Sequence, residues 1–130
     1  MFDEDDGKTW QDRWEEVAHA ERVAFEQMTP AQLLAFIRSG RVGLYYGVWS
    51  VIARVGTLEQ FGLAMFDVLE KSTDFLVRFH AGENLGKLMG LPEKDPLIMD
   101  VILHQDAPPQ DALRRLRQAL AERLGEPEKR

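Results

Sequence analysis

Apolar residues recur along this chain at intervals of three and four positions, and short groups of Thr, Ser, Asp, Gly and Pro interrupt them. Such spacing places apolar side chains on one face of an α-helix, while the interrupting residues start and stop helices. No segment sustains the alternation of a β-strand, so the chain is predicted to be all-α. The predicted helices span residues 9–28, 30–39, 42–55, 58–71, 75–89, 96–104 and 111–124.

Two ten-residue segments, at 46–55 and at 79–88, are versions of one pattern and lie 33 positions apart. The matched pairs are Val48 and Ala81, Ile52 and Leu85, Ala53 and Gly86, Arg54 and Lys87, and Val55 and Leu88. A spacing of this size is typical of helical repeats, in which each unit buries its apolar face against the next. The helices then group into three hairpins over residues 30–55, 58–89 and 96–124.

The second unit carries the clearest motif, from Asp74 through the Val77-Arg78 pair to Leu-Gly-Lys-Leu at 85–88. It resembles the short HEAT-like repeat of the phycobilisome-lyase type. The resemblance covers about residues 30–125, and it is strongest over 57–90. It implies a short α-solenoid of about three helical hairpins, with an extra capping helix at the N-terminus and about seven helices in all.

The other units depart from this repeat. Tyr45 stands where the family has its arginine, Asp111 falls near that position in the third unit, and Trp49 and Gly82 occupy a small-residue position. We expect the bulky Tyr45 and Trp49 to pack on the first helix, because the end of an array must be sealed. The apolar stripe expected to seal it consists of Trp10, Trp14, Val17, Ala24 and Met28.

The resemblance also implies two rows, with the first helix of each hairpin in an outer row and the second in an inner row that meets partners. Repeat position places Gly47, Ser50 and Arg54 in register with His80, Glu83 and Lys87. Hydrogen-bonding and charged groups on such a face suit recognition of a protein segment. The predicted protein-binding residues are Ser50, Arg54, His80, Glu83 and Lys87.

The net charge of −6 is unevenly distributed. Residues 1–30 hold nine acids and three bases, whereas residues 109–130 hold four acids and six bases. An acidic chain is poorly suited to general binding of a phosphate backbone. The arginines at 114, 115 and 117 leave two alternatives open, which are a solvated helix face and a site for an acidic partner or nucleic acid.

Catalysis and metal binding find little support in the sequence. The chain has no cysteine, which excludes disulfides and thiolate zinc sites. His80 and Glu83 share a helix face, but Gly47 and Ser50 stand at the corresponding positions of the preceding unit and supply no second ligand pair. No cofactor or metal is expected. A metal- or tetrapyrrole-linked enzyme, or an enzyme subunit, is kept as an alternative.

We expect one helical domain over residues 9–125, preceded by a disordered acidic segment at 1–8 and followed by a frayed tail at 126–130. No signal peptide or membrane span is evident, and the absence of cysteine fits a reducing cytoplasm. The leading hypothesis is a non-catalytic HEAT-like module or small scaffold that binds a protein partner or itself. Nucleic-acid binding is the second alternative.

Overall fold

A computed structural model describes residues 9–39 and 46–125, apart from the side chains of Trp10 and Trp14. Expectations about residues 1–8, 126–130, Tyr45 and those two tryptophan side chains lie outside the described part. Seven α-helices and no strand are found within it, which confirms the all-α prediction. The helices are α1 (Trp10–Glu26), α2 (Pro30–Arg38), α3 (Gly47–Val55), α4 (Leu58–Lys71), α5 (Phe75–Met89), α6 (Pro96–Ile102) and α7 (Gln110–Arg123).

Local side-chain chemistry sets where these helices begin. At α2 the hydroxyl of Thr29 accepts a hydrogen bond of 3.1 Å from the backbone N–H of Gln32, whose side-chain oxygen accepts one of 2.9 Å from the N–H of Thr29. Thr9 and Thr57 begin α1 and α4 in the same way. Asp74 begins α5 by accepting from two backbone N–H groups. Each cap satisfies donors that have no partner within the helix.

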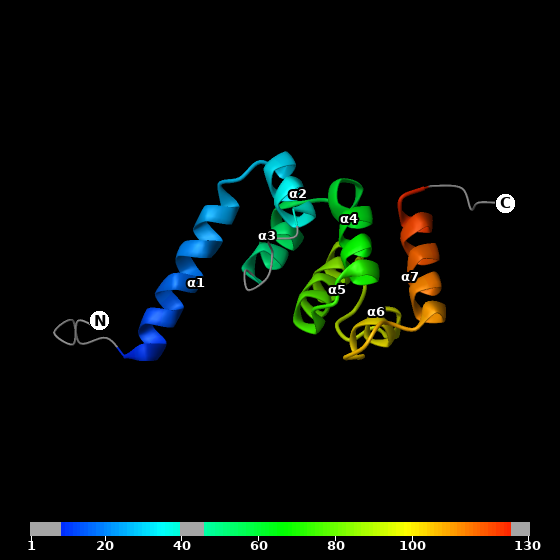
Figure 1. The fold of residues 1–130 in the computed structure, drawn as a ribbon. Helices are drawn as coiled ribbons and strands as arrows, with labels where there is room; N and C mark the ends of the chain where they lie inside the picture. The colour runs from blue at the N-terminus through cyan, green and yellow to red at the C-terminus, as the bar shows by residue number, and fades with distance from the viewer. Residues whose placement is uncertain (1–8, 40–45, 126–130) are drawn as a thin grey trace.

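The helices lie in two rows (Figure 1). One row runs α1, α3, α5, α6 and the other runs α2, α4, α7, with each helix packed on its neighbour in the row. The most extensive contact joins the rows, between α4 and α5. The core follows this seam, where the fully buried side chains include those of Trp49, Phe61, Met65, Leu69, Leu85, Leu116 and Leu120.

The third pair of helices differs from the expected order. If its first helix continued the outer row, α6 would pack beside α4, and α7 beside α5. Instead α6 packs on α5, and α7 packs on α4. Two glycines allow these close approaches, since a β-carbon at Gly82 would overlap Ile102 of α6, and one at Gly62 would lie 3.1 Å from Leu120 of α7. The arginines of α7 therefore lie outside the row that contains α3 and α5.

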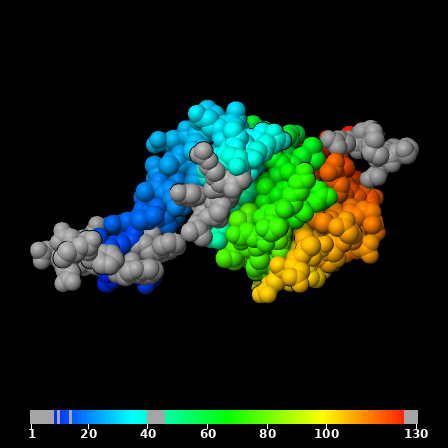
Figure 2. Space-filling model, in the orientation of Figure 1, coloured from blue at the N-terminus to red at the C-terminus, as the bar shows by residue number. Residues whose placement is uncertain are grey.

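The first helix projects from the rest of the molecule (Figure 2), with α3 as its main neighbour. The predicted sealing stripe is wrong for Val17, which is 55% exposed, and for Ala24, while Phe25 is the buried residue. Val17 is exposed because α3 is much shorter than α1 and covers only part of its length. The nine residues of α3 span about 13 Å, roughly half the length of the seventeen-residue α1. Trp49, by contrast, is fully buried on α3.

Candidate functional site

One face of α5 is left uncovered by its neighbours α3, α4 and α6. An α-helix turns by 100° per residue, so its exposed and half-exposed side chains other than Leu88 fall on a single side, opposite the buried Val77, Ala81 and Leu85. On this side the apolar side chain of Leu76 is 47% exposed. We define the α5 face as Phe75, Leu76, Phe79, His80, Glu83 and Lys87.

The first half of the α5 face is aromatic. The imidazole of His80 stacks on the ring of Tyr46, with centroids 4.6 Å apart and planes 22° apart. Phe79 meets His80 edge-on at 5.7 Å, and Phe75 lies 6.1 Å from Phe79. All four side chains are half-buried. Their contacts hold the rings in fixed positions, so a partner would meet a surface that needs little further ordering.

The second half of the α5 face is charged and borders a cleft of about 150 Å³. Leu91, Ile98 and Met99 give the cleft an apolar lining, while Glu83 and Lys87 contribute charged groups. The loop between α5 and α6 forms the remaining wall. In this loop Lys94 has a φ of 63°, a left-handed conformation that non-glycine residues seldom adopt. The cleft has room for a single side chain supplied by another molecule.

The five predicted binding residues lie on α3 and α5, which are neighbours in one row. His80, Glu83 and Lys87 lie together on the α5 face, as expected. Arg54 instead makes an ion pair with Glu26 of α1. Ser50 is exposed, and its hydroxyl donates a hydrogen bond of 3.0 Å to the carbonyl oxygen of Gly47 in its own helix. His80, Glu83 and Lys87 thus share one side of α5, whereas Arg54 of α3 contacts α1.

Arg78 is a buried cation to which the sequence analysis assigned no role. It is 2% exposed. Its guanidinium donates to the carbonyl oxygen of Ser72 at 2.8 Å and to three consecutive carbonyl oxygens at positions 104–106, at 2.8–3.0 Å. These oxygens lie at the C-terminal ends of α4 and α6, where backbone dipoles favour a positive charge. Arg78 thus joins the α4–α5 turn to the α6–α7 turn. The Val77-Arg78 pair was the signal that could have found it.

The first two arginines of α7 have acidic partners within the chain. Arg114 pairs with Asp111 one turn earlier at 2.6 Å, and Arg115 reaches Asp100 of α6 at 3.4 Å. All four side chains are more than half exposed. This arrangement is that of a solvated helix face with ion pairs of small energy.

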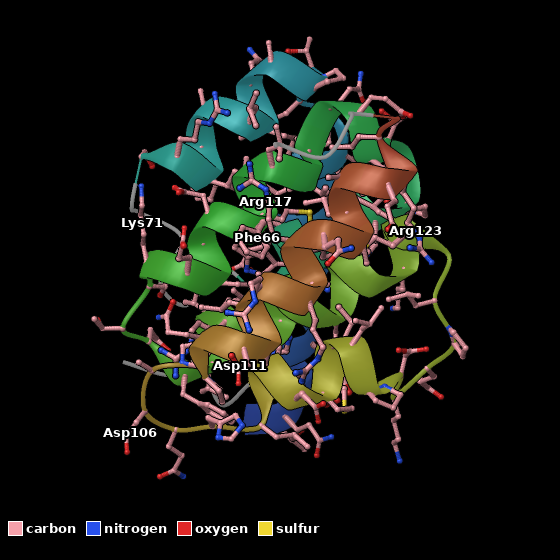
Figure 3. The ribbon with its side chains drawn as sticks, turned by 90° about the vertical axis from the view of Figure 1, so that its right-hand side faces the viewer. Phe66, Lys71, Asp106, Asp111, Arg117 and Arg123 are labelled. Carbon is pink, nitrogen blue, oxygen red and sulfur yellow. The ribbon has the colours of Figure 1, made fainter. Side chains whose placement is uncertain are left out.

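Two further arginines bind α7 to the rest of the fold. Figure 3 shows Arg117 over the ring of Phe66 on α4, with its guanidinium carbon 5.5 Å from the ring centroid. Arg123 donates a hydrogen bond of 2.9 Å to the carbonyl oxygen of Met89 at the end of α5. Of the three arginines that suggested an acidic partner, Arg117 therefore takes part in the packing of α7 on α4.

A larger cavity of about 460 Å³ lies between α2, α4 and the start of α5. Its lining mixes the apolar Ile37 and Val68 with Arg38, and with an ion pair of 3.0 Å between Lys71 and Asp67. The hydrogen bond from Lys71 to Asp67 raises the pKa of Lys71 above its ordinary value. No grouping of three or more potential metal ligands occurs among residues 9–39 and 46–125.

Among the described helices, none combines the length and the apolar character needed to cross a membrane. No protein-family model, curated protein or solved structure matches this chain. Its function is therefore argued from its own surfaces.

Proposed function

We propose that this protein is a small, non-catalytic HEAT-like interaction module of the cytoplasm that binds a protein partner through the α5 face. One observation carries the proposal. Helix α5 contacts α3, α4 and α6 on three sides. On its remaining side, stacked aromatic rings, an exposed leucine and two charged groups lie together.

This composition is that of a protein-binding surface. Aromatic side chains supply much of the binding energy at interfaces, and charged residues favour the rim. On the α5 face the rings occupy the N-terminal half, while Glu83 and Lys87 occupy the C-terminal half beside the cleft. Since the rings are already packed against one another, binding costs little side-chain entropy.

Two features support the HEAT-like part of the proposal. The segments that repeat at 33 residues, 46–55 and 79–88, lie largely on α3 and α5, which pack side by side in one row. The first helices of the same two hairpins, α2 and α4, pack side by side in the other row. This stacking is how a repeat array shares a continuous core between neighbouring units.

Substituting Leu76→Glu tests the proposed surface, because it places a charge among the rings of the α5 face. Leu63→Glu is the matched control, since Leu63 is 42% exposed and lies on α4. Wild type and both variants, checked by circular dichroism, would be used to capture partners from the native host and to measure self-association. We expect Leu76→Glu to weaken association by about tenfold or more and Leu63→Glu to leave it unchanged.

The site of contact is measured with a lysine-reactive crosslinker and mass spectrometry. Lys87 lies on the α5 face, whereas Lys71 lies on α4 beside Asp67. Crosslinks from Lys87 that disappear in Leu76→Glu would support the proposal. Association that survives Leu76→Glu, or is lost equally in Leu63→Glu, would show that the α5 face is not the binding surface.

A further inference from the structure

Glu83 and Lys87 form an open pair of opposite charges. Both side chains are exposed, and neither has an ion-pair partner among the described residues. Asp67 and Lys71 have the same spacing on α4, but they contact each other at 3.0 Å. The α5 face therefore presents one free acid and one free base, a helical turn apart, to whatever binds there.

The two ends of the α5 face are complementary to each other. Its aromatic half presents Phe79 and His80 next to the charge pair, and its C-terminal end adjoins the cleft with its apolar wall of Leu91, Ile98 and Met99. At 1.5 Å per residue, His80 lies about 7.5 Å before the point midway between Glu83 and Lys87, and Met89 at the end of α5 lies about 6 Å after it, with the cleft residue Leu91 two residues further on. The half-exposed ring of His80 and the cleft thus lie at similar distances from the centre of the charge pair.

We propose that the occupant of the α5 face is a second copy of this chain, bound through antiparallel pairing of two α5 helices. The two-fold axis passes between Glu83 and Lys87. This inference rests on the proposed function and specifies its partner. In a two-fold interface residue i of one copy meets residue j of the other, and j meets i.

The antiparallel arrangement pairs opposite charges and also brings the rings of each copy to the cleft of the other. Glu83 of each copy faces Lys87 of the other, so two intermolecular ion pairs form with no like charges opposed. The half-exposed rings around His80 on each copy approach the cleft beside Leu91 on the other. A thioether such as that of Met99 packs well against an aromatic ring. A parallel pairing would instead bring Glu83 to Glu83 and Lys87 to Lys87, which like-charge repulsion disfavours.

Charge exchange tests this pairing directly. Glu83→Lys alone and Lys87→Glu alone each convert both ion pairs into repulsions, and we expect each to weaken dimerisation by about tenfold or more. The double variant Glu83→Lys/Lys87→Glu restores opposite charges across the axis, so its dissociation constant should return to within about threefold of wild type. Sedimentation equilibrium of the full chain at low salt measures all four proteins.

The matched controls are Asp67→Lys, Lys71→Glu and their double variant, which make the same exchange on α4. We expect none of them to change the dimer. Circular dichroism shows whether each variant has kept its helices. If the wild-type chain is monomeric at all concentrations, or if the double exchange at 83 and 87 fails to restore association, the inference is wrong.

The two proposals fail in different ways. A monomeric chain whose captured partner is lost in Leu76→Glu and crosslinked through Lys87 would overturn the dimer and leave the α5 face as a binding surface for another protein. A dimer that responds to none of the substitutions on the α5 face, together with partner capture that survives Leu76→Glu, would overturn both proposals.

Discussion

Arg78 shows how one side chain can join two distant turns. Its guanidinium binds four backbone carbonyl oxygens, one at Ser72 and three at positions 104–106. No carboxylate is among these partners, and the charge lies where α4 and α6 end. The planar guanidinium spreads its donors over several directions, whereas a lysine ammonium is a compact point charge. The identity of the cation should therefore matter as well as its charge.

We expect Arg78→Lys to lower the free energy of unfolding by about 2–4 kcal/mol, because buried carbonyl oxygens lose charged hydrogen bonds that lysine cannot all replace. Urea unfolding followed by circular dichroism measures this loss. Arg114→Lys is the control, and it should change stability by no more than about 0.5 kcal/mol, since its partner is exposed. Equal effects of the two substitutions would contradict the assigned role of Arg78.

At the scale of the helices, the distance between two packed helices depends on where glycine stands at their contact. Gly82 lies on the side of α5 that meets α6, and a β-carbon there would overlap Ile102 Cγ2 and lie 3.3 Å from Leu69. The glycine thus sets the distance between α5 and α6. Alanine favours a helix by about 1 kcal/mol over glycine, so this close approach is retained against the local preference of the backbone.

Gly82→Ala should lower stability by about 1–2 kcal/mol, because the overlap with a stiff β-branched side chain outweighs the gain in helix propensity. Adding Ile102→Leu removes Cγ2, and the double variant should recover part of the loss. Gly47→Ala serves as the control, since its β-carbon would meet Arg22 at an ordinary 3.6 Å, and it should be neutral or stabilising. Thermal unfolding of the wild type and the three variants would reveal a wrong assignment if Gly82→Ala gained stability.

At the scale of the whole molecule, two rows of helices are joined along the seam between α4 and α5. The last pair of helices packs with α6 beside α5 and α7 beside α4. Arg117 of α7 lies over the ring of the buried Phe66 of α4. Cation–π contacts at partly exposed sites contribute about 0.5–1 kcal/mol.

A double-mutant cycle of Arg117→Gln and Phe66→Leu tests the placement of α7. We expect a coupling energy of about 0.5–1 kcal/mol between the two positions. The parallel cycle with Arg114→Gln should give a coupling near zero, because Arg114 pairs with Asp111 in its own helix. Chemical unfolding supplies the energies, and no coupling at Arg117 would contradict the packing of α7 on α4.

The helices themselves were largely predictable, because their signals are local. The predicted 58–71 and 75–89 coincide with α4 and α5. Residues of one helix face recur at fixed intervals, so His80, Glu83 and Lys87 were also placed together correctly. Each of these inferences needs only residues within about one or two turns of one another.

Tertiary structure alone decided which helices meet. The order of the third pair depends on the close approaches at Gly62 and Gly82, and the partners of Arg78 at 104–106 lie 26–28 residues away. Periodicity could not choose between Val17 and Phe25 on α1, because both are apolar and only the short α3 determines which face is covered. Sequence by itself determined the helices and the common side of His80, Glu83 and Lys87, while packing between distant segments determined what surrounds that side and leaves it open.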